Sequence, residues 1–134
     1  MDAVAVINEA IDAYATGGIE ALARFYHPDA EIVGGPYFGP TGTYTGGPEA
    51  LREIASVTDS EYEQFTARPM EVRAGGTPDR VLVEGIVTYG SSQGRPGGAW
   101  RSWWVVEVRE ERIARLEVFH DASEAFQAAG LSPP

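Results

Sequence analysis

The chain has 134 residues, of which 43% are apolar, and it carries a formal net charge of −10 with no cysteine. This length suits a single domain over residues 1–134, and the negative charge argues against nucleic acid or an anionic membrane surface as a partner. The absence of cysteine and lysine excludes disulfides, thiolate nucleophiles and lysine Schiff bases, and two histidines cannot form a three-histidine zinc site.

The N-terminal region predicts two helices. Apolar side chains recur at three- and four-residue steps over residues 3–16, which is typical of a helix with one buried face. A glycine pair ends this helix, and a shorter one is expected over residues 19–26. Pro28 ends it, because the residue before a proline disfavours the helical conformation.

The N-terminal region lacks a basic leader, and no apolar run reaches membrane length, so we expect a cytoplasmic protein.

The next segment predicts a short strand, a long loop and a third helix. The strand is expected over residues 30–33. Residues 34–47 are too rich in glycine and proline for regular structure, and loops of this length often carry function. Pro48 suits the first position of a helix over residues 48–57.

The second half predicts four consecutive strands and a final helix. The strands are expected over residues 61–74, interrupted at Pro69, over 81–89, and in a long hairpin over 99–120. A capping box at Asp121 begins the last helix. Consecutive strands joined by short turns pair antiparallel. The expected fold class is therefore α+β: a curved, mostly antiparallel sheet wrapped around the N-terminal helices and enclosing an apolar pocket.

The hairpin over residues 99–120 has two faces, because successive side chains of a strand point to opposite sides. The mixed face carries Trp103 and Phe119 among charged side chains, and we expect it to be half exposed or to meet a second subunit. The apolar face is expected to form the pocket floor and carries Trp100, Ser102, Trp104, Val106, Val108, Leu116, Val118 and His120.

Three segments, in this order and spacing, carry a resemblance: GGIEALARFYHPDAEI at 17–32, GTYTGGPEAL at 42–51 and RIARLEVFHDASEAFQAAGL at 112–131. The chain resembles the SnoaL-like branch of the nuclear-transport-factor-2-like superfamily over essentially its whole length. The resemblance implies a cone-shaped α+β barrel with an apolar pocket, often a homodimer through the outer sheet face. Members include polyketide cyclases, ketosteroid isomerases and limonene-epoxide hydrolases alongside many non-enzymes, so the fold alone does not define the function.

The acidic residues that the resemblance implies for catalysis are missing. Where ketosteroid isomerases have an Asp base after the first strand, this chain has glycine and proline at 34–36. Their first-helix Tyr falls nearest Ala10, one turn before Tyr14. The Asp of the epoxide hydrolases falls at Val118, and that of the SnoaL-type cyclases falls at Trp104. The resemblance therefore supplies no acid–base scheme for this chain.

His120 is the candidate catalytic residue. It ends the last expected strand on the inward face, and an imidazole exchanges a proton near neutral pH. The alternative is a histidine held by hydrogen bonds in the core or at the cavity rim. Asp121 is in position to orient His120 but is better explained as a helix cap, and turn chemistry explains His27.

Several aromatic side chains of the chain are candidate contacts for a small, apolar, cyclic ligand, because their rings form flat apolar walls and Tyr hydroxyls can donate hydrogen bonds to it. The alternative is that these side chains simply fill the core. No metal or organic cofactor is required. Residues 90–94 match the pattern G-x-S-x-G, but a nucleophile elbow needs a strand-to-helix turn, and strands flank this segment. The candidate ligand contacts are Tyr14, Tyr26, Tyr44, Phe65, Trp100, Trp104 and Val118.

Three functions remain open. The first is a cofactor-free isomerase, cyclase or hydrolase that transfers protons on an apolar cyclic substrate through His120. The second is a non-catalytic protein that binds an apolar ligand, which the loss of every family Asp favours. The third is an interaction module that dimerises through Trp103 and Phe119.

Overall fold

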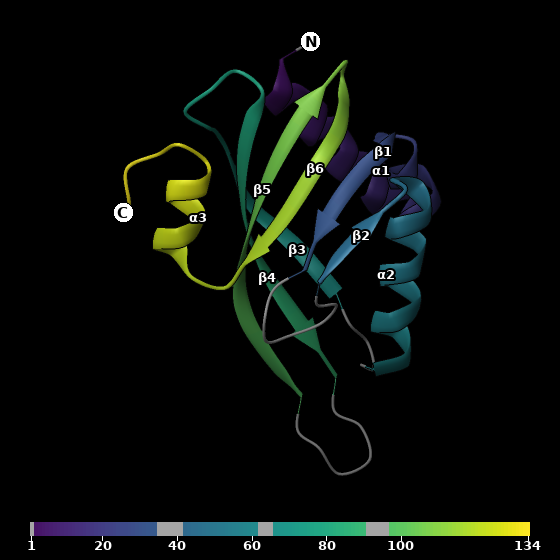
Figure 1. Ribbon diagram of the computed structural model, residues 1–134. Helices are drawn as coiled ribbons and strands as arrows, with labels where there is room; N and C mark the ends of the chain where they lie inside the picture. Colours follow the sequence, from purple (N-terminus) through teal and green to yellow (C-terminus); the bar gives the residue numbers. More distant parts are fainter. Residues whose placement is uncertain (1, 35–41, 62–65, 91–96) are drawn as a thin grey trace.

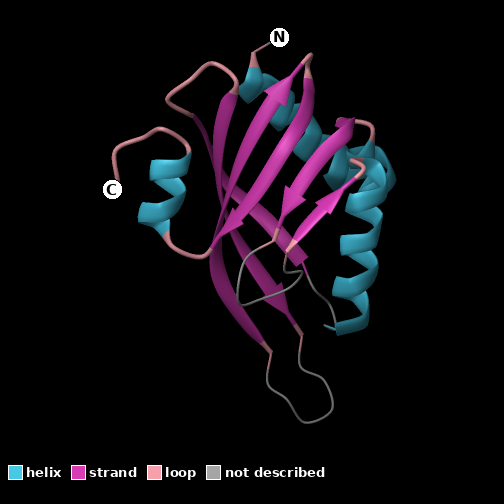
Figure 2. Ribbon diagram, viewed as in Figure 1, coloured by secondary structure: helices cyan, strands magenta, loops and turns pink. Residues whose placement is uncertain are grey.

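In the computed structural model, a six-stranded sheet curves around two helices, and a third helix lies on its other face (Figure 1, Figure 2). The structure describes residues 2–34, 42–61, 66–90 and 97–134. The elements, in chain order, are α1 (Ala3–Ala23), β1 (Tyr26–Val33), β2 (Thr43–Thr45), α2 (Pro48–Glu61), β3 (Thr66–Ala74), β4 (Arg80–Tyr89), β5 (Gly98–Arg109), β6 (Arg112–Phe119) and α3 (Ala122–Ala128).

The six strands form one sheet in the order β2-β1-β6-β5-β4-β3. Strands β3 to β6 form the predicted antiparallel meander, and only β1 and β6 pair in parallel among the strands described. The sheet ends at β2 and β3, so it curves without closing into a barrel. Helices α1 and α2 lie on its inner, concave face (Figure 1). The predicted α+β fold class is confirmed.

Helix α1 spans 21 residues and consists of two helical segments, as the sequence predicted. The carboxylate of Asp2 caps its start by accepting a hydrogen bond from the backbone N–H of Ala5 at 2.8 Å. A kink at Gly18, where φ is 70°, separates the two predicted parts. Neither α1 nor any other helix that the structure describes is long and apolar enough to cross a membrane. The helix buries Ala3, Val6, Ile7, Ala10 and Ala23.

Strand β1 begins at Tyr26, earlier than predicted, and it includes Pro28. It pairs with β6 so that Tyr26 lies opposite Ile113 and Glu31 lies opposite Arg115, with a shift of register between these two pairs. A proline is tolerated in this interval because the shift interrupts the regular hydrogen-bond ladder. Strand β2, which the sequence did not predict, pairs antiparallel with the end of β1.

The protein has two hydrophobic cores, an inner core between the sheet and the helices α1 and α2, and an outer core on the opposite face of the sheet. Helix α3 covers part of this outer face and completes the outer core. Trp103 in this core is only 6% exposed. The prediction that Trp103 is half exposed or meets a second subunit is therefore wrong, because α3 of the same chain covers it. Phe119 packs against the same cluster. The buried members of this core are Leu82, Trp103, Val105, Ala125, Phe126 and Ala129.

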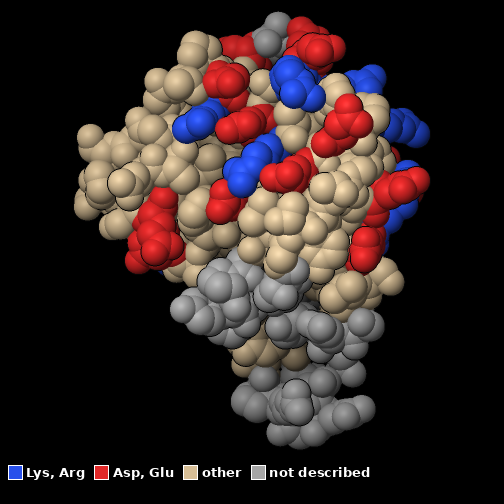
Figure 3. Space-filling view, in the orientation of Figure 1, with Lys and Arg blue, Asp and Glu red and all other residues tan. Residues whose placement is uncertain are grey.

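The part of the outer face beside α3 carries paired charges. The guanidinium of Arg115 lies 3.2 Å from the carboxylate of Glu31 and 2.9 Å from that of Glu117. Arg80 lies 3.5 Å from Glu107. Figure 3 shows acidic and basic side chains interleaved over this face. Exposed ion pairs stabilise a fold by only about 0–1 kcal/mol each, so burial of the two cores contributes more.

Candidate functional site

A cavity of about 300 Å³ lies between the inner face of the sheet and the two helices α1 and α2. Its walls come from six elements besides α1, which supplies the largest share. The residues that line it are Ile7, Ala10, Ile11, Tyr14, Ile19, Leu22, Tyr26, Leu51, Ile54, Ala55, Thr58, Ala67, Pro69, Val83, Trp104, Val106, Ile113 and Leu116.

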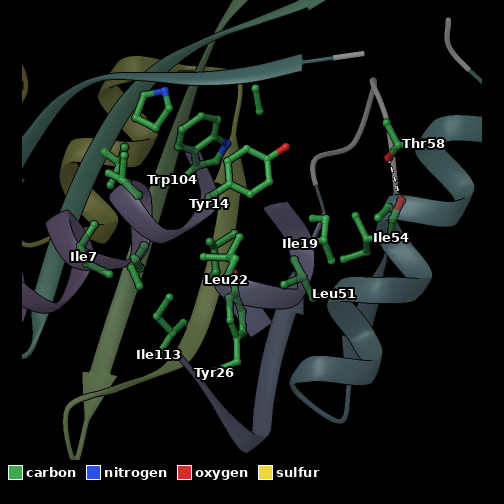
Figure 4. A pocket seen from close by; sticks show the side chains of 18 residues that line it. Ile7, Tyr14, Ile19, Leu22, Tyr26, Leu51, Ile54, Thr58, Trp104 and Ile113 are labelled. Atoms are coloured by element: carbon green, nitrogen blue, oxygen red, sulfur yellow. Dashed lines mark hydrogen bonds between the residues drawn. The ribbon is translucent and has the colours of Figure 1, made fainter. Parts of the chain in front are cut away.

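The helical part of the wall follows from periodicity. Ile7, Ile11 and Tyr14 recur at three- and four-residue steps, so α1 presents them on one face. Ile19 and Leu22, beyond the kink, turn toward the same space. Figure 4 shows Tyr14 and Trp104 near one end of the cavity and side chains of α2 on another side. The cavity is therefore built where amphipathic helices meet the apolar face of the sheet.

The described walls of the cavity contain no charged side chain and only four side chains with a polar atom, those of Tyr14, Tyr26, Thr58 and Trp104. The Thr58 hydroxyl donates a hydrogen bond to the carbonyl oxygen of Ile54 at 2.8 Å, which leaves its oxygen as an acceptor. Tyr26 is buried, and burial raises the pKa of its phenol, so it stays neutral. These walls suit an uncharged, mostly apolar molecule.

Three of the predicted ligand contacts, Tyr14, Tyr26 and Trp104, line this cavity together. Tyr14 is 38% exposed, which places its ring at the edge between cavity and solvent. Tyr26 is buried. Trp104 comes from the centre of β5, and its neighbour two residues along, Val106, also faces the cavity.

The other predicted contacts are elsewhere. Tyr44 lies in β2 and packs at the edge of the inner core. The Trp100 ring lies 5.4 Å from that of Tyr89, measured between centroids. Val118 lines a separate cavity. Neither these three residues nor His120 is among the described residues that line the main cavity, and Phe65 lies outside the described residues.

The second cavity, of about 250 Å³, lies where β6 ends and α3 begins. His120 lines it, so the expectation that His120 stands at the edge of the apolar pocket floor is not met. The strand ends at Phe119, and the chain then turns toward α3. Burial lowers the pKa of His120, which favours a neutral imidazole. The residues lining this cavity are Gly34, Glu117, Val118, Phe119, His120, Asp121 and Glu124.

The local roles expected for Asp121 and His27 are observed. The Asp121 carboxylate accepts a hydrogen bond from the backbone N–H of Glu124 at 2.9 Å and so caps α3. The Nδ1 atom of His27 accepts one from the backbone N–H of Asp29 at 3.2 Å. Among the residues that the structure describes, no three His, Asp or Glu side chains gather closely enough to hold a metal ion.

Sequence reasoning missed Thr58, Ala67 and Pro69 as wall residues. Thr58 lies one position past the predicted end of the third helix, and α2 in fact continues to Glu61. Pro69 stands opposite Gly85, next to a shift of register between β3 and β4. The proline itself was the available signal, because prolines inside strands mark bulges that re-aim side chains.

Residues 7–116 match the family model of the SnoaL-like domain. The chain belongs to the SnoaL-like family. No curated protein matches this SnoaL-like chain.

Several solved structures share its fold. TerC, crystallised with polyporic acid, is 22% identical with a TM-score of 0.72, and the match covers 94% of this chain and 95% of TerC. An NTF2-like protein from Burkholderia thailandensis is 18% identical with a TM-score of 0.78 over 96% and 97% of the two chains. A protein with a ketosteroid isomerase-like fold from Catenulispora acidiphila, in complex with trimethylamine, is 20% identical with a TM-score of 0.66 over 92% and 93%. At these identities the likeness establishes the fold of the SnoaL-like chain.

Proposed function

We propose that this SnoaL-like protein binds a small, uncharged, ring-containing molecule in the cavity between α1, α2 and the sheet. One observation carries the proposal: the described walls are uncharged, although the whole chain has a net charge of −10. A charged ligand would lose its hydration there without gaining an ionic partner, which is costly. An apolar ligand would gain the free energy of burial instead.

The size and the polar groups narrow the ligand further. A volume of about 300 Å³ is at the lower end of the range for small-molecule pockets. The flat face of Trp104 suits a ring, and the phenol of Tyr14 can donate a hydrogen bond to a carbonyl or hydroxyl oxygen. The best candidate is therefore a compact ring system with one neutral oxygen.

A binding role fits this cavity better than acid–base catalysis. An isomerase, cyclase or hydrolase working by proton transfer needs an acceptor within hydrogen-bond reach of its substrate. The side chains described in the cavity offer two phenols, one hydroxyl and one indole, and His120 lines the second cavity instead. Burial raises the pKa of the Tyr26 phenol, so this group is a hydrogen-bond donor rather than a base.

Titration with 1-aminoanthracene, a neutral ring compound whose fluorescence increases in apolar surroundings, tests the proposal. The wild-type protein should bind it saturably. Trp104→Ala should weaken binding at least about tenfold because it removes an aromatic wall, whereas the matched variant Trp100→Ala should change the affinity less than about twofold. Absence of binding to the wild type, or equal losses in the two variants, would overturn the proposal.

His120→Ala separates binding from catalysis. The variant should bind 1-aminoanthracene as tightly as the wild type, because His120 is not among the residues that line the main cavity. A cyclic enone and a cyclic epoxide incubated with the wild-type protein should be recovered unchanged. Turnover that disappears in His120→Ala would instead support the cofactor-free enzyme.

A further inference from the structure

Gly85 of β4 lies directly against the indole ring of Trp104. A Cβ atom at position 85 would stand 2.4 Å from Cη2 and 2.7 Å from Cζ3 of that ring. Real Cβ contacts are never this short, so the ring occupies the space that any other side chain would need. Trp104 faces Val83 across the β4–β5 pair, and its ring leans along β4 to reach Gly85.

Strand β3 pairs with β4 on the side away from β5 and also borders Gly85. Pro69 of β3 stands opposite Gly85, and the β3–β4 register shifts immediately after this pair. The carbonyl oxygen of Arg68 would lie 2.9 Å from the same Cβ atom. Pro69 also lines the main cavity beside Trp104. The six-membered ring of the indole therefore lies over the backbone of Gly85, which pairs with the bulged segment of β3.

We infer that Gly85 determines which ligands the cavity accepts, because it sets the depth at which the Trp104 indole lies. The inference rests on the proposed function, a cavity for an uncharged ring compound. With hydrogen at position 85, the indole lies back against the backbone of β4 and leaves the cavity of about 300 Å³ open to flat, fused-ring ligands. A larger side chain at position 85 would restrict the cavity to smaller rings.

The direction in which the indole would move follows from what surrounds it. The backbones of β3 and β4 lie on the sheet side, and a hydrogen-bonded sheet resists displacement. The cavity of about 300 Å³ lies on the other side. A methyl group at position 85 therefore pushes the ring into the cavity and reduces the room for a ligand.

The test compares Gly85→Ala with the wild type using two neutral probes, the fused tricyclic 1-aminoanthracene and the smaller bicyclic 1-naphthylamine. Gly85→Ala should weaken binding of the larger probe at least about tenfold, equivalent to about 1.4 kcal/mol, and change that of the smaller probe less than about threefold. Adding Trp104→Phe to Gly85→Ala should restore binding of the larger probe, because the smaller ring leaves room for the methyl group.

Gly98→Ala is the matched control. Its Cβ atom would stand 2.5 Å from the Tyr89 hydroxyl oxygen in the same strand pair, so it causes a comparable clash with an aromatic side chain. Neither Gly98 nor Tyr89 is among the described residues that line the main cavity. This variant should keep the wild-type preference between the two probes.

Each outcome bears on a separate claim. If the wild type binds neither probe, the proposed function fails and the inference fails with it. If the wild type binds both probes and folded Gly85→Ala keeps the same preference, the inference about Gly85 is wrong although the proposed function stands. If Gly85→Ala does not fold, as judged by circular dichroism, the double variant with Trp104→Phe decides. Failure of that variant to fold or to bind 1-aminoanthracene would overturn the inference.

Discussion

The guanidinium of Arg80, the first residue of β4, donates a hydrogen bond to the carbonyl oxygen of Ala128, the last residue of α3, with an Nη1–O distance of 3.0 Å. Helix α3 has 7 residues, too few for a helix that is stable alone. The backbone N–H of Gly76 donates a second bond, to the carbonyl oxygen of Ala129, at 2.8 Å. One bond comes from the β3–β4 connection and the other from the start of β4, and together they anchor the end of α3.

We expect Arg80→Met to lower the free energy of unfolding by about 1 kcal/mol, because it removes a charge-assisted hydrogen bond and keeps most of the apolar stem. The exposed Arg109, at the end of β5, offers a matched control. Arg109→Met should change the free energy of unfolding by less than about 0.5 kcal/mol. Urea denaturation followed by circular dichroism measures both variants, and equal effects would argue against an anchoring role for Arg80.

Phe126→Ala should destabilise the fold more strongly, by about 3 kcal/mol, because the buried ring joins α3 to the outer core. The same variant should shift the tryptophan emission to longer wavelength as Trp103 loses its cover. Met70→Ala is the control, since Met70 is 55% exposed and its loss should cost less than about 0.5 kcal/mol. Unchanged emission in a folded Phe126→Ala variant would contradict the packing of α3 on Trp103.

The strands of the second half could be predicted from the sequence because alternation over residues 81–89 and 99–109 carries its own signal. Two features of the first half could not. Strand β2 lies among glycines, and its pairing with β1 comes from backbone groups that no side-chain pattern encodes. The sequence placed Pro28 between a helix and a strand, yet it lies within β1, where the register shift between β1 and β6 accommodates it. In both places, tertiary pairing outweighed local preference.

The site was predictable to the extent that periodicity gives the direction of a side chain. It correctly oriented Tyr14 and Trp104 toward the interior. It could not say how far along β6 the cavity extends, so His120 was expected at the edge of the pocket floor and lines another cavity. Nor could it say what covers an apolar patch, which is why Trp103 was assigned to a subunit interface rather than to α3.

The turn before α2 depends on Gly47, whose φ is +56°. A Cβ atom there would lie 2.1 Å from the carbonyl oxygen of His27, so Gly47→Ala combines left-handed backbone strain with a clash against β1. We expect a loss of about 3 kcal/mol or more in the free energy of unfolding. In Gly46→Ala the new Cβ atom would meet nothing closer than 3.8 Å, so this variant loses stability through backbone strain alone. Urea denaturation should give a lower free energy of unfolding for Gly47→Ala than for Gly46→Ala. The reverse order would contradict the close approach of Gly47 to the carbonyl oxygen of His27.

His120 should make the stability of the fold depend on pH. Burial lowers its pKa below the ordinary value of 6.5, so the unfolded chain takes up this proton at a higher pH than the folded chain does. As pH falls from about 7.5 through the unfolded pKa toward the lower folded one, the free energy of unfolding should therefore decrease. His120→Gln should remove this part of the pH dependence in urea denaturation. An NMR titration of the His120 ring proton checks the cause directly. An inflection above 6.5 would mean that the carboxylates of Glu117, Asp121 and Glu124 around the cavity outweigh burial.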